Sequence, residues 1–135
     1  VSTGGTITLT SPATKVQVGY RYQSDGQMLR QDVGAADGTA QGKYQRTHRV
    51  NVRVHDTLGM KFGAGFHTSG PGKLTEKTVR TSAVPGDTMV PLESGDIEIS
   101  WEGTYTKDNY VTWRNDSMFP GTVLAVMPQL HTQDR

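Results

Sequence analysis

The sequence contains no cysteine, little apolar material and no long hydrophobic run. Without cysteine the chain has no disulfide, no thiolate nucleophile and no cysteine-based metal site. Hydrophobic residues make up only 33% of the chain. No apolar run approaches the roughly 20 residues that a helix needs to cross a bilayer, so we expect no membrane span. The formal net charge is +1, so any basic surface that attracts nucleic acid must be local.

Glycine and proline, by contrast, are frequent, with 16 and 6 copies among 135 residues. This composition favours many turns over long helices. The length suits one domain with a core of its own. Because the chain begins at Val1, with neither an initiator methionine nor a signal-peptide pattern, we expect residues 1–135 to be a single β domain that is one domain or fragment of a longer protein.

The clearest structural signal is the alternation of apolar and polar residues from Arg46 to His55. Val50, Val52 and Val54 fall on one side, which predicts a half-buried β-strand. The opposite side forms a polar and partly basic outer face, made of Thr47, Arg49, Asn51, Arg53 and His55. The residues at 56–59 predict a turn, and those at 60–64 predict the start of a return strand.

Shorter alternating stretches predict further strands on either side of this one. Two of them, Asp96–Glu102 and Tyr110–Arg114, each carry a tryptophan and predict a hairpin with cross-strand packing of Trp101 on Trp113. Ser24-Asp25-Gly26 predicts a turn. The other predicted strands are Thr6–Thr10, Lys15–Tyr22, Lys73–Arg80 and Thr122–Met127.

The stretch Thr122–Met127 is nearly all apolar, which predicts a central strand buried on both faces and ended by Pro128. Residues 83–91 and 32–42 predict loops. The second of these is long and made of small residues, so we expect it to be mobile in isolation and to serve an interface. About eight short strands separated by turns indicate an all-β fold, either an antiparallel β-sandwich or a small barrel with long loops.

Motifs for catalysis and for ligand binding are missing from the sequence. His48 and His55 lie seven positions apart on one predicted strand and so point to opposite faces. There is no nucleophile elbow, phosphate-binding loop or zinc motif. We therefore predict no catalytic residue, no metal, no cofactor and no enzyme activity.

Two groups of side chains leave functional alternatives open. The carboxylates of Asp96, Glu98 and Glu102 share a strand face, which suits a glycosidase pair, a solvated acidic stripe, or ion pairing with Arg49 and Arg53; we favour the last two. The aromatic residues suit core packing or a carbohydrate-binding or base-stacking platform. They are Tyr20, Tyr22, Tyr44, Trp101, Tyr105, Tyr110 and Trp113.

Several motifs together resemble the tail nozzle proteins of short-tailed bacteriophages, also called tail tubular protein B or packaged-DNA stabilisation protein. The motifs are structural: a TAQGK loop, a strand ending in a D-T-L-G turn, a later G-D strand, and an F-P turn followed by an apolar strand that closes with M-P. They cover about two-thirds of the chain. Here they are Thr39–Lys43, Arg46–Gly59, Gly95–Trp113 and Phe119–Pro128.

The resemblance implies a structural virion protein of a phage tail, a nozzle or connector-type subunit, assembled in the cytoplasm of the host bacterium. It implies a homo-oligomeric ring, with six-fold symmetry favoured, that contacts other tail or connector proteins and lets genomic DNA pass transiently. We expect Arg46, Arg49 and Arg53 to face the channel or the DNA. We expect the subunit interface to include Gly34, Gly38, Gln41, Gly42, Lys73 and Glu76. The alternative function is a carbohydrate-binding β-sandwich module of a host-attachment protein.

Overall fold

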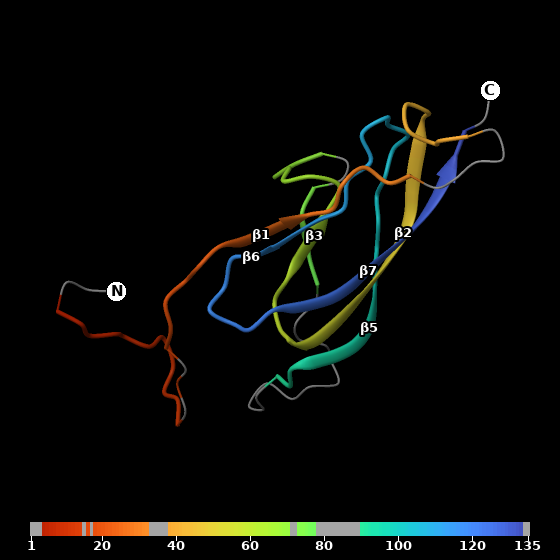
Figure 1. The fold of residues 1–135 in the computed structure, drawn as a ribbon. Helices are drawn as coiled ribbons and strands as arrows, with labels where there is room; N and C mark the ends of the chain where they lie inside the picture. The colour runs from red at the N-terminus through yellow and green to blue at the C-terminus, as the bar shows by residue number, and fades with distance from the viewer. Residues whose placement is uncertain are drawn as a thin grey trace.

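The computed structural model has an all-β fold, as the sequence predicts, and no helix occurs in the part of the chain that it describes (Figure 1). In the same part of the chain, no helix is therefore long and apolar enough to cross a membrane. The described residues include seven strands, which form two antiparallel sheets. The described residues are 4–14, 16, 18–32, 38–70, 73–77 and 90–133.

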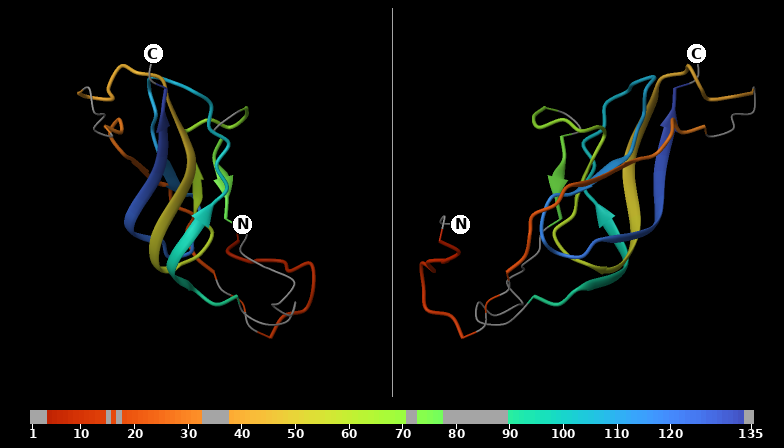
Figure 2. Two further views of the ribbon diagram at one scale, coloured as in Figure 1. Left: turned by 90° about the vertical axis from the view of Figure 1, so that its right-hand side faces the viewer. Right: turned by 60° about the vertical axis from the view of Figure 1, so that its left-hand side comes forward.

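The two sheets pack on each other as a small β-sandwich. The three-stranded sheet has β2 at its centre, between β5 and β7, and the three strands lie side by side in the left view of Figure 2. The four-stranded sheet has the order β1-β6-β3-β4. The strands are β1 (Ser24–Gln27), β2 (Gln45–Thr57), β3 (Lys61–Gly63), β4 (Thr75–Glu76), β5 (Glu93–Ile99), β6 (Thr112–Asn115) and β7 (Thr122–Thr132).

Strand β2 organises the core, as its alternation predicts. The side chains of Val50, Val52 and Val54 are at most 1% exposed, and each contributes about 1.5–3 kcal/mol by leaving water. They pack against apolar residues of both sheets, namely Met60, Phe62, Ile97, Ile99 and Val111. The core therefore lies between the sheets, and β2 supplies its centre.

Two irregularities in β2 change the predicted faces. Thr47 pairs with Leu130 and Arg49 with Gln129, so His48 is an extra residue in a β-bulge. The bulge turns Thr47 inward, where it is buried, and the prediction that it faces outward is wrong. A second irregularity lies before Thr57, and β2 runs through part of the predicted turn.

Strand β7 lies at a sheet edge, so the prediction of a central, doubly buried strand is wrong. Its Leu124 side chain is 60% exposed. The strand also continues through Pro128 to Thr132, because a proline without an N–H group is tolerated on an edge strand. The longer β2 occupies the centre instead, with a partner on each side.

The predicted hairpin between the two tryptophan-bearing strands is also wrong. Strand β5 pairs with β2, whereas β6 pairs with β1 and β3. Trp101, just after β5, and Trp113, in β6, consequently pack against the core from different sheets. The predicted turn at residues 24–26 is part of β1, where Gly26 leaves room for the Trp113 ring. Strand β3 confirms a strand after the turn at residues 56–59, but it joins the four-stranded sheet.

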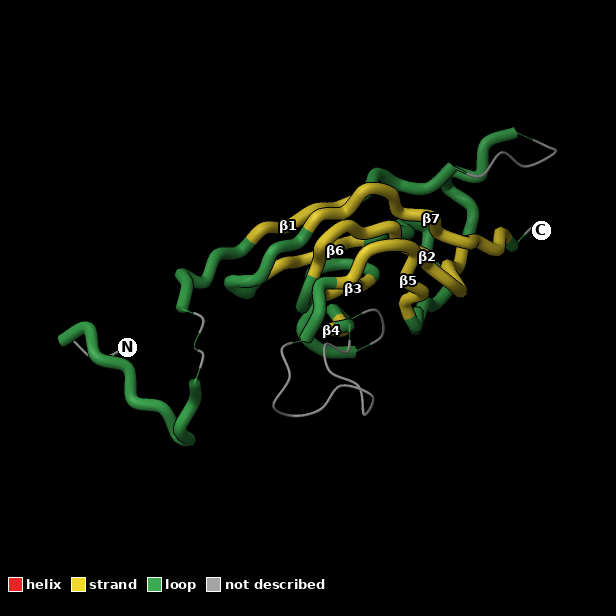
Figure 3. Tube along the Cα trace, turned by 90° about the horizontal axis from the view of Figure 1, so that it is seen from below, coloured by secondary structure: helices red, strands yellow, loops and turns green. Residues whose placement is uncertain are grey.

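The N-terminal part of the chain forms an extended arm that leads away from the sandwich (Figures 1 and 3). No described residue from 4 to 23 belongs to a strand, so the strand predicted at Thr6–Thr10 is not formed, and neither is the one at Lys15–Tyr22 in its described residues; residues 15 and 17 lie outside them. Without a neighbouring strand, their alternation has no ladder to join. The strand predicted at Lys73–Arg80 is reduced to β4; its residues 78–80, like 83–89 of a predicted loop, lie outside the described residues.

Candidate functional site

The outer face of the three-stranded sheet is a ladder of ion pairs. Arg53 donates to both carboxylate oxygens of Asp96, at 2.6 and 2.8 Å, and Arg49 lies 3.3 Å from a carboxylate oxygen of Glu98. These pairs form because β2 and β5 place Arg53 directly opposite Asp96. The ion-pair interpretation of the acidic stripe is thus confirmed for these two carboxylates.

Charge compensation makes this face a weak anion-binding surface. The hydrogen bond from Arg53 lowers the pKa of Asp96 below its usual range, and the same bond raises the pKa of Arg53. Both side chains are exposed, so water and salt screen the pair. Arg46 is also exposed and lies opposite His131 on β7. The three arginines predicted to face DNA therefore share β2, but two of them are charge-balanced.

A second group of ion pairs connects the N-terminal arm to the sandwich. Asp116 accepts hydrogen bonds from Lys61 Nζ at 2.7 Å and from Arg21 Nη2 at 3.1 Å. The bond from Lys61, followed by that from Arg21, lowers the pKa of Asp116. Next to it, Arg114 forms a bidentate pair with Asp25, which lowers the pKa of that carboxyl. Sequence reasoning missed this group because its members are far apart in the chain.

The loop predicted as an interface is partly a fixed turn. Asp32 accepts hydrogen bonds from the Thr39 hydroxyl at 2.8 Å and from the Ala40 N–H at 2.9 Å. The buried Gln45 side chain donates to the Ala40 carbonyl at 2.6 Å. These hydrogen bonds hold the described end of this loop to Asp32 and Gln45, while Gly38, Gln41 and Gly42 are exposed; Gly34 lies outside the described residues.

The other predicted interface residues lie on the opposite sheet. Glu76 belongs to β4 and sits opposite Lys61 of β3, and Lys73 lies in the turn just before this strand. Both side chains are exposed. The structure thus divides the predicted interface residues between two surfaces: the turn that precedes β2, and the β4 edge of the four-stranded sheet.

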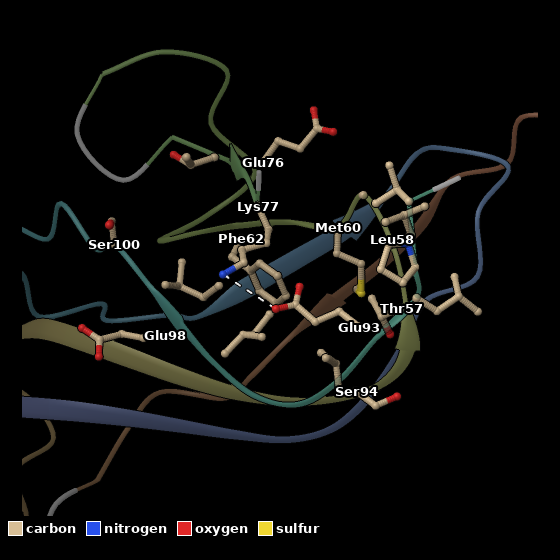
Figure 4. Close-up of a pocket in the computed structure, with 18 residues that line it drawn as sticks. Thr57, Leu58, Met60, Phe62, Glu76, Lys77, Glu93, Ser94, Glu98 and Ser100 are labelled. Atoms are coloured by element: carbon tan, nitrogen blue, oxygen red, sulfur yellow. Dashed lines mark ion pairs between the residues drawn. The ribbon is translucent and has the colours of Figure 1, made fainter. Parts of the chain in front are cut away.

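A groove of about 670 Å³ lies between β5 and the β3–β4 side of the other sheet (Figure 4). Its depth is apolar and includes Met60 and Phe62, while Leu58 and Leu92 lie nearer its mouth. Lys77 and Glu93 form an ion pair of 4.0 Å across it. No single sequence segment signals this groove, because its walls come from β2, β3, β4, β5 and the segments that join them.

A shallow aromatic surface lies beside the turn that precedes β2. Tyr44 and Tyr105 line it together with Lys107, whose Nζ stands 5.3 Å from the centre of the Tyr44 ring. The Tyr105 hydroxyl lies 3.3 Å from Nδ1 of His131. Both tyrosines are exposed, whereas Trp101 and Trp113 pack against the core. The aromatic platform considered from the sequence is thus reduced here to two tyrosines.

No protein-family model and no curated protein matches the chain. In the described part of the molecule, no group of three histidine, aspartate or glutamate side chains is placed to hold a metal ion. The fold defines the class as a small all-β sandwich domain. Its described surfaces offer an ion-pair ladder, a fixed turn, an apolar groove and an exposed arm.

Proposed function

We propose that this chain is a structural subunit of the tail of a short-tailed bacteriophage, of the nozzle or connector type. The observation that carries the proposal is that motifs behind the resemblance interlock. Thr57, from the D-T-L-G turn, accepts a hydrogen bond from the Thr122 N–H at 2.9 Å and donates to the Thr122 carbonyl at 3.1 Å. Leu58 N–H donates to the Pro120 carbonyl at 3.0 Å. The two motifs therefore hold β2 and β7 together, which supports a structural role for the residues that carry the resemblance.

The exposed turn before β2 supports a role in assembly. The hydrogen bonds that Asp32 accepts hold the TAQGK motif in one shape while its Gln41 and Gly42 face solvent. A preformed surface loses less conformational entropy when it meets a neighbour. The proposal places this turn at contacts within a homo-oligomeric ring, with six-fold symmetry favoured, or with other tail or connector proteins. A ring needs heterologous interfaces that close by rotation.

The ion-pair ladder suits a surface past which DNA slides. Arg49 and Arg53 are neutralised by Glu98 and Asp96, so they offer phosphates little free charge. Arg46 forms no ion pair within the described part of the chain and is the best contact among the three. We propose that genomic DNA passes such a face transiently within the virion, because tight binding would oppose its movement.

The test of this function is the size and shape of the particle in solution. Light scattering should give a mass that is a multiple of the 14.7 kDa chain, and negative-stain electron microscopy of the same sample should show rings with a central channel. A monomer at every concentration, or particles without a channel, would contradict the proposal. Addition of duplex DNA should leave the ring's mass unchanged at physiological salt, because the proposed contacts are weak.

The exposed tyrosines favour a second candidate, a carbohydrate-binding module for host attachment. Tyr44 and Tyr105 line one shallow pocket, and sugar rings pack on such aromatic faces. NMR titration with host surface glycans would shift the resonances of both tyrosines if this function holds. Tyr105→Ala should then abolish the shifts, and Tyr20→Ala, which removes an exposed tyrosine elsewhere, should not.

A further inference from the structure

The N-terminal arm carries an apolar face that nothing in the described molecule covers. Val16, Val18 and Tyr20 are 54%, 68% and 97% exposed. They occupy alternate positions in the sequence, so their side chains would share one side if this segment formed a strand. Isolated exposed apolar residues are ordinary, but three in strand register form the face of a β-strand that lacks a sheet.

The arm is fixed to its own sandwich at one end and points away from it at the other. Arg21 donates to the carbonyl of Asp116 at 2.7 Å and to its carboxylate, and the Tyr22 hydroxyl donates to the Phe119 carbonyl at 3.1 Å. From this anchor the chain leaves the body of the molecule (Figure 3). A second copy is therefore the natural source of a sheet for this segment.

The three-stranded sheet offers two edges, and they differ in how well they accept a strand. The β7 edge contains Pro128, which has no N–H to donate, and an irregularity at Leu124, which β2 leaves without a partner in the register. Prolines and bulges are the usual means of blocking an edge. Strand β5 has neither proline nor a described partner beyond β2. Its outer edge is the more open of the two.

Charge does not oppose the arm at the β5 edge. The carboxylates of β5 belong to Glu93, Asp96 and Glu98, and each is paired with a basic side chain of its own copy. Residues 4–23 contain Lys15 and Arg21 and no acidic residue. The arm therefore brings no further carboxylate to this edge.

The groove beside β5 suits the apolar face of the arm. It is lined by Ile97 and Ile99 of β5 and by Met60 and Phe62 beyond them. Its mouth includes Leu92, which is exposed. An added strand would place alternate side chains over this groove while its backbone completes the hydrogen bonds of the β5 edge.

We infer that residues 16–20 of one copy add as a strand to the free edge of β5 in a second copy, with Val16, Val18 and Tyr20 over the groove. The contact is heterologous, because arm and edge are different surfaces, so repetition of it builds a ring or a filament. This inference rests on the self-assembly in the proposed function, and it adds a contact between the arm and the β5 edge to the contact proposed for the turn before β2.

Crosslinking of two single-cysteine variants tests the contact directly, because the natural chain has no cysteine. Val18→Cys keeps a small apolar side chain in the arm, and Ser100→Cys places a thiol on the groove wall at an exposed position. Mixing the two with a short bis-maleimide should give a mixed dimer in high yield. The matched control mixes Val18→Cys with Leu124→Cys, another exposed position, on β7, and should give at least tenfold less mixed dimer.

Three further outcomes are decisive against the inference. A mixed dimer with Leu124→Cys in place of Ser100→Cys would move the arm to the other edge and overturn it. If light scattering shows an assembly but neither mixture crosslinks, arm exchange is wrong while the proposed function stands. A monomer at all concentrations overturns both.

Two double variants that introduce negative charge into the arm provide a second, independent test. Val18→Asp with Tyr20→Asp puts two charges on the apolar face of the arm and should convert assemblies to monomers. Thr8→Asp with Thr10→Asp adds the same charge to the arm away from this face and should leave the assembly intact. Equal assembly of both variants would overturn the inference. A cooperative unfolding transition in dilute, monomeric protein at the temperature of the natural chain verifies that each variant is folded, since all four positions are exposed.

Discussion

Strand β2 and the N-terminal arm carry the same sequence pattern and have opposite fates. Val50, Val52 and Val54 alternate with polar residues and are buried, while Val16 and Val18 alternate in the same way and are exposed. The difference lies in their neighbours: β2 has a strand on each side, and the arm has none among the described residues. Alternation therefore specifies the face of a strand but does not provide the sheet that buries it.

The largest difference should come from placing a carboxylate on the apolar face of β2 and, for comparison, on the apolar face of the arm. Val52→Asp buries a carboxylate with no basic partner in the core, and we expect it to cost about 4 kcal/mol or more and to unfold the domain. Val18→Asp places the same group in solvent and should leave the free energy of unfolding unchanged. Urea denaturation followed by tryptophan fluorescence measures both. Equal stability of the two variants would contradict the claim that Val52 is buried in the sandwich and Val18 is exposed on the arm.

A smaller loss should follow from filling the space above Gly26. A Cβ atom there would overlap Cε2 of Trp113, so the ring must move. We expect Gly26→Val to destabilise the domain by about 1–3 kcal/mol through overpacking. Gly4→Val, in the arm with nothing within 4 Å of its Cβ position, should be neutral. Chemical denaturation compares them, and a neutral Gly26→Val would contradict the observed packing.

The joint between β2 and β7 should show an effect of similar or smaller size. Thr57→Val keeps the shape of the side chain but leaves the Thr122 N–H without its acceptor. We expect a loss of about 1–3 kcal/mol. Thr8→Val makes the same chemical change on the exposed arm and should be silent. A thermal melt of each variant is sufficient, and identical melting temperatures would show that this joint contributes nothing.

The smallest effect should be the pH dependence of the exposed ion pairs. The pKa values of Asp25, Asp96 and Asp116 are lowered in the folded state by their basic partners. The unfolded chain therefore takes up protons first, so the stabilisation is complete above about pH 4 and is lost as the pH falls through the folded pKa values. Asp116→Asn should reduce this acid sensitivity, whereas Glu76→Gln should not. Melting temperatures between pH 2 and 7 at low salt measure it.

The sequence predicted what is local and failed where pairing is long-range. Alternation located β2, the inward side chains of β5 and the all-β class, because one buried face leaves a period-two trace in the sequence. The hairpin joining the two tryptophan-bearing strands was wrong because β5 pairs with β2, a strand far away in the chain. The bulge at His48 reversed the side of Thr47, because one extra residue in β2 changes the register with β7.

The candidate site was predictable only in part. The partners of Arg49 and Arg53 were named correctly among the alternatives, since strand faces restrict which charges can meet. No single segment of the sequence predicts the groove or the ion pairs of Asp116 with Lys61 and Arg21, because the residues of each come from several parts of the chain. The arm was predicted as a strand, and its pattern fits that prediction only if a second copy supplies the sheet.

Amide hydrogen exchange at two protein concentrations tests the contrast between β2 and the arm most directly. In dilute, monomeric protein the N–H of Val52 should be strongly protected, and that of Val18 should exchange at nearly the rate of an unstructured peptide. In concentrated, assembled protein Val18 should become protected while Val52 stays as it was. An arm that is protected in the monomer, or one that stays unprotected in the assembly, would contradict the account.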